Sequence, residues 1–270
     1  MKKAGLWFLA FVITLSSAVY QRLTGPTYPL RGKTTLKGTE IPYELIRTHE
    51  IGPECKIKVK APEEEIDGHL IYKRYKTNDA WTEVPMNREN GYLSAVLPQQ
   101  PAAGKLAYKV FLDKDDEELV LSGKEPVVIR FKGAVPGYIL IPHVIIMFLA
   151  MLFSTRAGLE ALRKGSDPGK LVIWTLALLI TGGMILGPMV QKFAFGALWT
   201  GFPFGYDLTD NKTLIALLGW IAAWVAGRKG KSARGWILGA SILTLVIFLI
   251  PHSLLGSELD YSEIETPVNK

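Results

Sequence analysis

The stretch Val135-Pro-Gly-Tyr-Ile-Leu-Ile-Pro-His-Val-Ile-Ile-Met-Phe-Leu-Ala-Met-Leu-Phe153 divides this chain of 270 residues into two parts. Its nineteen residues include no acid, Lys or Arg. An apolar helix of about twenty residues is long enough to cross roughly 30 Å of hydrocarbon. The residues before the stretch alternate as in β-strands, and those after it form further apolar runs. We therefore predict an α+β membrane protein in which a soluble β domain precedes a bundle of transmembrane helices.

The charge of the chain indicates membrane orientation rather than a polyanionic partner. The net charge is +6, yet residues 21–134 hold 18 Lys and Arg against 17 Asp and Glu. The excess lies in short connectors between apolar runs, so no nucleic-acid partner is expected. The single cysteine, Cys55, has no partner for an internal disulfide and alternates with lysines, which favours a buried, small apolar side chain.

The N-terminus, residues 1–20, fits two interpretations. Lys2 and Lys3 precede an apolar run, and small residues follow at 16–18, as in a cleaved signal peptide. In the alternative, residues 4–20 form an uncleaved signal anchor that ends at Tyr20. Both interpretations direct the next segment across the membrane.

Residues 21–134 are predicted to form an extracytoplasmic, antiparallel β-sandwich. Glycines and prolines exclude a helix in 22–39, which is expected to be an extended lead-in. Downstream, apolar and polar residues alternate at a period of two, and turn signals such as Asn90-Gly91 separate the alternating runs. Several short strands without an intervening helical period are typical of a sandwich. The strands expected on this ground are 55–60, 69–75, 92–97, 106–112 and 127–131.

Part of this β region resembles a known family. The motifs that carry the resemblance are Ile71-Tyr72-Lys-Arg-Tyr75, Trp81-Thr-Glu-Val-Pro-Met86, Gly91-Tyr92-Leu-Ser-Ala-Val-Leu-Pro98 and Ala107-Tyr108. Over residues 52–132 the chain resembles the Ig-like or fibronectin type III-like modules of bacterial surface proteins. The resemblance implies a fold only, because such sandwiches host many functions.

Residues 135–255 are expected to form a four-helix transmembrane bundle, followed by an acidic tail over 256–270. Residues 214–227 are short for a span and require bilayer thinning or an upstream extension through Thr209. The four expected spans are 135–153, 171–190, 214–227 and 236–255.

Basic connectors fix the expected orientation. The N-terminal pair and the connectors around 154–170 and 228–234 together carry ten Lys and Arg against two acids. The loop 191–213 and the tail carry three Lys against six acids. Because Lys and Arg resist translocation, the basic connectors are placed inside. The prediction is a multi-pass protein of a bacterial plasma membrane whose β-sandwich and C-terminus are extracytoplasmic.

Two histidines are candidate cofactor ligands. His143 and His252 both occur in an Ile-Pro-His context, and counted along their spans they reach a similar depth near the outer leaflet. Ionisable residues inside a membrane face the protein interior and are functional by default. The pair could hold a haem b or a metal between helices. In the alternative, each imidazole bonds a carbonyl that its neighbouring proline has freed.

The loop between the second and third spans is rich in aromatic residues. Trp199, Phe202, Phe204 and Tyr206 suit the headgroup level of a bilayer. A sharper hypothesis makes these four residues a lid over the histidines, with acceptors from Asp207 and Asp210. Asp210 or Thr209 is also a candidate N-cap for the next helix.

No nucleotide-binding, metalloprotease or serine-hydrolase motif occurs in the chain, so no enzyme activity is predicted. The first hypothesis is a cell-envelope protein whose membrane bundle presents an outward Ig-like module to another envelope protein or polymer. The rival is a membrane redox or transport subunit that holds a haem or metal between His143 and His252.

Overall fold

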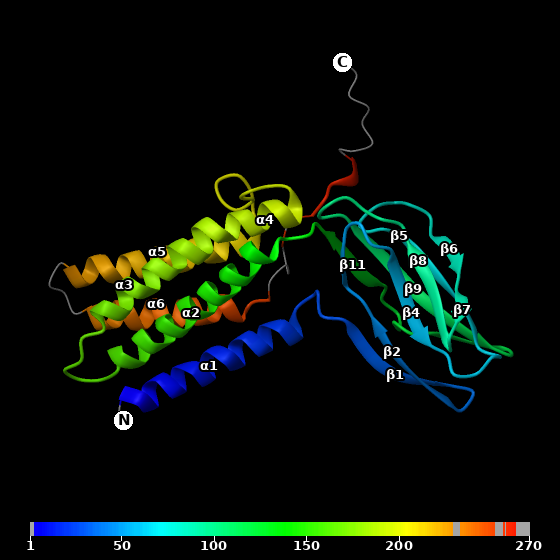
Figure 1. Cartoon of the computed structure of the whole chain (residues 1–270), viewed down its shortest axis with the longest axis horizontal. Helices are drawn as coiled ribbons and strands as arrows, with labels where there is room; N and C mark the ends of the chain where they lie inside the picture. The colour runs from blue at the N-terminus through cyan, green and yellow to red at the C-terminus, as the bar shows by residue number, and fades with distance from the viewer. Residues whose placement is uncertain (1–2, 229–232, 252–255, 257, 263–270) are drawn as a thin grey trace, which may run out of the picture. The chain divides into compact units, whose positions relative to one another are not determined.

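The computed structural model describes residues 3–228, 233–251, 256 and 258–262, and the chain forms two compact units (Figure 1). The helical unit comprises Met1–Pro26 and Val135–Ser257, and the β unit comprises Thr27–Ala134 and Glu258–Lys270. The fold is therefore mixed α+β. The chain changes from strands to helices at the start of the apolar stretch 135–153.

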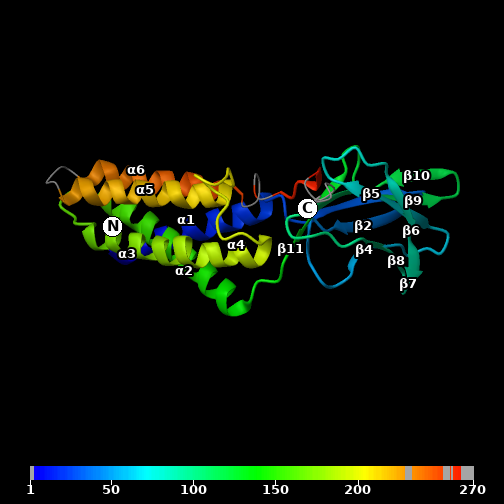
Figure 2. The ribbon, with the colours of Figure 1, turned by 90° about the horizontal axis from the view of Figure 1, so that it is seen from above.

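The described helices of the helical unit pack side by side, as Figures 1 and 2 show. Three of these segments form one continuous helix: α3 passes into the π-helical segment η1 and then into α4. The core of the unit contains small residues and the fully buried Trp220, whose Nε1 donates to Thr244 Oγ1 at 2.9 Å. The helices are α1 Lys3–Thr24, α2 Gly137–Ala161, α3 Gly169–Leu178, η1 Leu179–Leu186, α4 Gly187–Phe195, α5 Leu208–Arg228 and α6 Ala233–Leu249.

Among the described residues, only two of the four spans expected over 135–255 correspond to helices that are long and apolar enough to cross a membrane, and the N-terminal helix adds a third. Three helices are long and apolar enough to cross a membrane: Lys3–Thr24, Gly137–Ala161 and Gly169–Phe195. The α6 helix is apolar but shorter. The α5 helix does extend upstream of residue 214, but its added turns bring in Asp210 and Lys212. These lengths and compositions are compatible with membrane insertion.

Glycines allow the helices to approach closely at some positions and not at others. A Cβ atom at Gly183 would lie 2.4 Å from Thr213 Cγ2, and one at Gly158 would lie 2.3 Å from Ser241 Oγ. By contrast, a Cβ at Gly235 or Gly239 would meet no described atom within 4 Å. Gly235 and Gly239 therefore make no close helix contact with the described atoms.

The β unit contains three sheets. The largest has the order β3-β11-β9-β5-β6 with β10 beside β9, the second has the order β4-β8-β7, and β1 and β2 form a hairpin. The strands are β1 Leu30–Leu36, β2 Thr39–Leu45, β3 Thr48–Glu50, β4 Cys55–Lys60, β5 Asp67–Arg74, β6 Thr82–Pro85, β7 Asn87–Glu89, β8 Tyr92–Leu97, β9 Lys105–Lys114, β10 Glu117–Val120 and β11 Val127–Lys132.

All five expected strands are present, and their pairing is antiparallel except that β11 pairs with β3 in parallel. Apolar residues of both larger sheets and of the hairpin meet in one hydrophobic core, where Tyr108 and Phe131 are fully buried. The expected lead-in over 22–39 is partly wrong, because α1 continues through Thr24 and β1 begins at Leu30. Lys37 and Gly38 both have positive φ and form the two-residue turn that lets β1 pair with β2.

Cys55 lies in this core, as its alternation with lysines predicts. Burial raises the pKa of its thiol to about 12. A thiol held protonated in an apolar core is inert, so Cys55 is a packing residue.

Candidate functional site

His143 makes a cross-helix hydrogen bond. Its Nδ1 lies 3.0 Å from the carbonyl oxygen of Gly182 in η1. Because a carbonyl only accepts, Nδ1 carries the proton and Nε2 keeps its lone pair. The same carbonyl also accepts the backbone N–H of Gly187 across the wide π-helical turn. The imidazole thus bonds a carbonyl of a neighbouring helix, not the one at Tyr138 that Pro142 was expected to free.

Its proposed partner, His252, lies outside the described residues. The shared haem or metal site of His143 and His252 therefore stays a prediction.

The loop between α4 and α5 is fastened to the first turn of α5. The Asp210 carboxylate accepts the backbone N–H groups of Thr200 at 2.7 Å and Gly201 at 3.1 Å. Asn211 Oδ1 accepts the N–H of Phe202 at 2.7 Å. The Asp207 carboxylate accepts the N–H of Thr209 at 2.7 Å, so Asp207 caps α5. Both acids proposed as lid acceptors are engaged within the loop itself.

The aromatic residues of this loop point outward. Phe202, Phe204 and Tyr206 are 65%, 83% and 93% exposed. Trp199 Nε1 donates to the Phe202 carbonyl at 3.0 Å, which keeps the loop compact. Exposed aromatic rings on this loop are compatible with the headgroup-level interpretation, which stays a prediction.

Lys212 is a functional candidate that the sequence interpretation missed. The residue is only 4% exposed, and its Nζ donates to the carbonyl of Ile250 at 2.8 Å. Gln21 Nε2 from α1 donates to the same carbonyl at 3.1 Å and to that of Phe248. A lysine cation at a helix C-terminus satisfies carbonyls that have no partner within the helix and offsets the negative end of its dipole. Lys212 and Gln21 therefore join the ends of three helices, α1, α5 and α6.

A buried ion group occupies the opposite end of the helical unit. Arg156 and Glu160, 4% and 7% exposed, form an ion pair at 2.5 Å, and Arg163 bonds Glu160 at 3.0 Å. The Arg156 guanidinium also lies 5.4 Å from the ring of Trp7 in α1. The connector predicted over 154–170 is wrong at Arg156 and Glu160, because α2 continues to Ala161.

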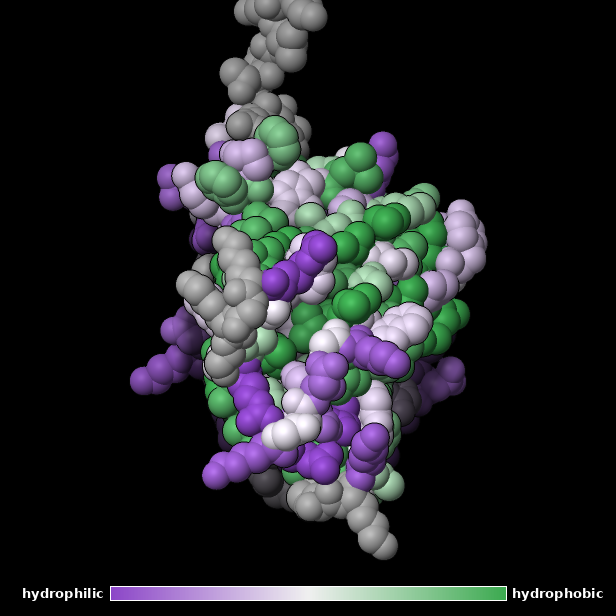
Figure 3. Space-filling model, turned by 90° about the vertical axis from the view of Figure 1, so that its left-hand side faces the viewer, coloured by the Kyte–Doolittle hydropathy of each residue, from purple (hydrophilic) through white to green (hydrophobic). Residues whose placement is uncertain are grey.

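The same end carries the α2–α3 and α5–α6 connections. A nitrogen of Arg234 donates to the Arg163 carbonyl, which ties the two connections together. Figure 3 looks onto this end and shows hydrophilic residues gathered over part of it, beside the hydrophobic sides of the helices.

In the β unit, the segment Glu258–Ser262 docks onto the sheets. Glu258 forms ion pairs with Lys76 at 2.8 Å and Lys105 at 3.4 Å. The Leu259 N–H donates to the carbonyl of Ala103 at 3.2 Å, and the Arg74 guanidinium lies 5.2 Å from the Tyr261 ring. The segment and the β5–β6 turn enclose a polar cavity of about 750 Å³.

One set of side chains in the β unit has metal-ligating chemistry. His69, Asp113 and Glu118 place one ligand atom each within 4.8 Å of one another. His69 Nδ1 is 3.3 Å from Asp113 Oδ2 and its ring stacks on Phe111 at 4.7 Å. Glu118 is exposed, and His69 and Asp113 are hydrogen-bonded to each other, so these residues are explained as a polar contact near the surface.

No protein-family model matches this chain, and neither curated proteins nor solved structures provide a match. The Ig-like resemblance of residues 52–132 therefore stays a prediction. Functional inference has to come from the geometry of the two units.

Proposed function

We propose that this chain is a multi-pass membrane protein that holds its β unit on the extracytoplasmic face, where the β unit binds another envelope protein or an envelope polymer. The observation that supports this proposal is the polarity of the helical unit. The basic connections meet at one end, through the Arg234–Arg163 bond. At the other end, Gln21 of α1 and Lys212 of α5 both donate to the carbonyl of Ile250, just after α6.

This polarity matters because of chain connectivity. The segments that lead into and out of the β unit follow α1, precede α2 and follow α6, so they leave the helical unit at the end opposite the basic connections. Lys and Arg near span ends resist translocation. The basic end is then cytoplasmic, and the β unit is extracytoplasmic. Outward Phe202, Phe204 and Tyr206 then lie at the outer headgroup level.

In this proposal α1 is an uncleaved anchor. Trp7 packs edge-on against Phe153 at 5.2 Å as well as covering Arg156, and Gln21 helps to cap α6. Loss of residues 1–18 would uncover the buried ion group. The intact mass of the purified protein tests the anchor, and a mass lacking these residues would contradict it.

Cysteine labelling tests the orientation. In a Cys55→Ser background, Asn90→Cys is expected to react with a membrane-impermeant maleimide in intact spheroplasts, whereas Ser166→Cys reacts only after lysis. Labelling of Ser166→Cys in sealed cells would overturn the topology.

Photo-crosslinking of the full-length protein tests the binding role. A photoreactive residue replacing exposed Tyr92 in the β unit is expected to give a discrete adduct in intact cells. The same residue replacing Ile145, exposed on α2, is the control and is expected to give no protein or polymer adduct. Absence of an adduct at Tyr92 and at a second exposed β position, Val96, would count against a binding role.

A redox function is the second candidate, and one observation favours it. Donation from His143 Nδ1 to the Gly182 carbonyl fixes the ring and leaves Nε2 as a potential ligand. Detergent-purified protein from haem-replete cells would then show a Soret band that is lost in His143→Ala and in His252→Ala. A colourless protein would remove the haem hypothesis.

A further inference from the structure

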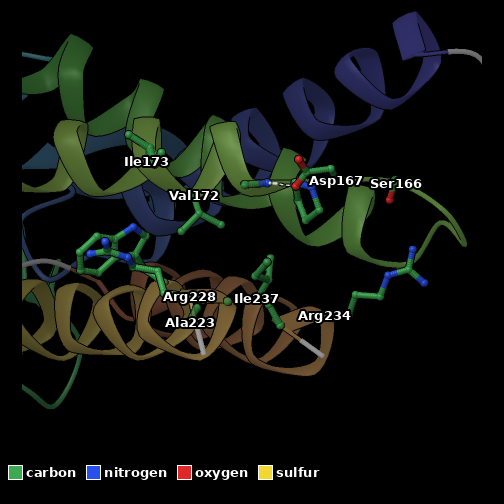
Figure 4. A pocket seen from close by; sticks show the side chains of 13 residues that line it. Ser166, Asp167, Val172, Ile173, Ala223, Arg228, Arg234 and Ile237 are labelled. Atoms are coloured by element: carbon green, nitrogen blue, oxygen red, sulfur yellow. Dashed lines mark hydrogen bonds between the residues drawn. The ribbon is translucent and has the colours of Figure 1, made fainter. Parts of the chain in front are cut away.

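A cavity of about 470 Å³ lies between α3, α5 and α6 at the basic end of the helical unit (Figure 4). Its wall combines charged and apolar side chains from three helices and from the α2–α3 connection. The lining residues used below are Asp167, Val172, Trp224, Arg228, Arg234 and Ile237.

The polar side of the cavity is cationic. Arg228 and Arg234 both line it, against one acid, Asp167, whose Oδ1 accepts the N–H of Gly169 at 2.9 Å. A guanidinium has five N–H donors in a planar fork, and the Arg234 bond to the Arg163 carbonyl uses one of them. Such forks suit the oxygens of a phosphate group.

Arg228 is held in place by an aromatic ring. Its guanidinium carbon lies 4.9 Å from the centre of the Trp224 ring. A guanidinium stacked on a ring keeps its N–H groups available at its edge. This arrangement orients Arg228 before any ligand arrives.

The remaining wall of the cavity is apolar. Val172 and Ile237 are buried, and Figure 4 shows their side chains pointing toward each other from α3 and α6. Ile173 and Trp224 are 58% and 38% exposed, so the apolar side opens laterally, along the flank of the helices. A free inorganic anion gains nothing from such a wall, whereas an acyl chain does.

We propose that this cavity binds one anionic glycerophospholipid, with its headgroup on the cationic side that Arg228 and Arg234 line and the start of its acyl chains along Val172, Trp224 and Ile237. The inference rests on the proposed function, because it places the cavity at the inner leaflet. Basic pockets between membrane helices on the cytoplasmic side suit anionic headgroups. The lipid would hold the ends of α3, α5 and α6 together.

Lipid binding to the full-length protein in detergent tests the proposal. Native mass spectrometry after delipidation and addition of phosphatidylglycerol is expected to show one retained lipid per chain. Phosphatidylcholine is expected to be retained about tenfold less, and inorganic phosphate is expected not to compete at millimolar concentration. Equal retention of both lipids would overturn the proposal. Full competition by phosphate would reassign the cavity to a free anion.

Variants locate the site. The double variant R228Q/R234Q is expected to retain phosphatidylglycerol at least about tenfold more weakly than the wild type. The control is Lys170→Gln, which removes one positive charge from an exposed position at the same end but outside the cavity lining. This variant is expected to bind phosphatidylglycerol as the wild type does. Equal loss in Lys170→Gln, or no loss in the double variant, would contradict the assignment.

Arg234→Gln removes the bond to the Arg163 carbonyl and can therefore disturb folding. Tryptophan fluorescence provides a second test of lipid binding that does not use this variant. Phosphatidylglycerol with brominated acyl chains is expected to quench one component of the tryptophan emission in the wild type. That component is absent in Trp224→Phe and reduced in Arg228→Gln. Quenching that is unchanged in Trp224→Phe would exclude an acyl chain from this wall.

The outcomes separate this inference from the proposed function. Selective lipid binding in detergent does not depend on sidedness, so labelling of Ser166→Cys in intact spheroplasts would overturn the topology alone. Correct topology without lipid selectivity would overturn the lipid site alone.

Discussion

The Tyr261 hydroxyl accepts the backbone N–H of Lys105 at 2.9 Å and lies 3.0 Å from the carbonyl oxygen of the same residue. One side chain from the tail thus occupies both backbone groups of the first residue of β9. Gln100 Oε1 is also within reach of this hydroxyl, at 2.9 Å. The segment Glu258–Ser262 therefore packs as part of the β unit, although it follows the helices in sequence.

Tyr261→Phe is expected to loosen this docking. The ring would keep its stacking with Arg74, but the Lys105 N–H would lose its acceptor. The change should lower the free energy of unfolding of the docked segment by about 1 kcal/mol. Hydrogen exchange of residues 258–262 measures it, and the nearby Ser262→Ala serves as a control with little expected effect. Unchanged protection in Tyr261→Phe would show that the hydroxyl contributes nothing.

Acid should release the same segment through Glu258. Burial raises the pKa of Glu258, but bonds and charges from Lys76 and Lys105 outweigh burial and hold this pKa below its ordinary value of 4.5. A carboxylate with a depressed folded-state pKa stabilises the fold above its unfolded pKa and loses this effect as the pH falls. Docking should therefore weaken as the pH drops below about 4.5.

A spin label at Ser262→Cys measures the acid effect as increased mobility. Asp79 serves as an internal reference, because its bond to Arg74 lowers its pKa to about 2, so it stays charged through this window. Glu258→Gln is the control and should be mobile at neutral pH without further change on acidification. A wild-type label that stays immobile as the pH falls from 4.5 to the Asp79 pKa of about 2 would refute the role of Glu258.

A matched pair of glycine variants tests helix packing. Gly183→Ala places a methyl group 2.4 Å from Thr213 Cγ2, and overpacking of this kind costs about 1–3 kcal/mol. Gly239→Ala meets nothing within 4 Å and should leave the thermal midpoint in detergent unchanged or slightly raised. Equal midpoints for both variants would contradict the packing at Gly183.

Local patterns were sufficient where each element depends on its own residues. The alternation of Cys55–Lys60 predicts β4 with its bounds, because a half-buried strand needs only a period of two. The hairpin turn at Lys37-Gly38 was missed because the surrounding glycines and prolines suggested irregular backbone.

Long-range partners could not be predicted from local patterns. Arg156 and Glu160 look like connector residues in the sequence, but Trp7, which is distant in sequence, covers Arg156 in the structure. Lys212 likewise marks the boundary of an apolar run, yet its partner carbonyl belongs to Ile250 on another helix. Of the site residues that were predicted, His143 has a cross-helix bond, which no count of residues along a span could reveal.

The buried ion group provides the sharpest test of this long-range packing. Glu160→Gln removes the charge that pairs with Arg156, while Trp7 and the surrounding helices still bury the guanidinium. Breaking one side of a buried ion pair costs about 3–5 kcal/mol, because the remaining charge is uncompensated. The variant should therefore show a strongly reduced thermal midpoint or yield.

Removing both charges should restore much of this loss. In Arg156→Met combined with Glu160→Leu, no buried charge remains unpaired, and replacement of a buried pair by apolar residues of similar volume is often neutral. Thermal midpoints of the wild type, both single variants and the double variant in one detergent form a complete cycle. A double variant as unstable as the single variant Glu160→Leu would mean that the loss does not come from an unpaired buried charge.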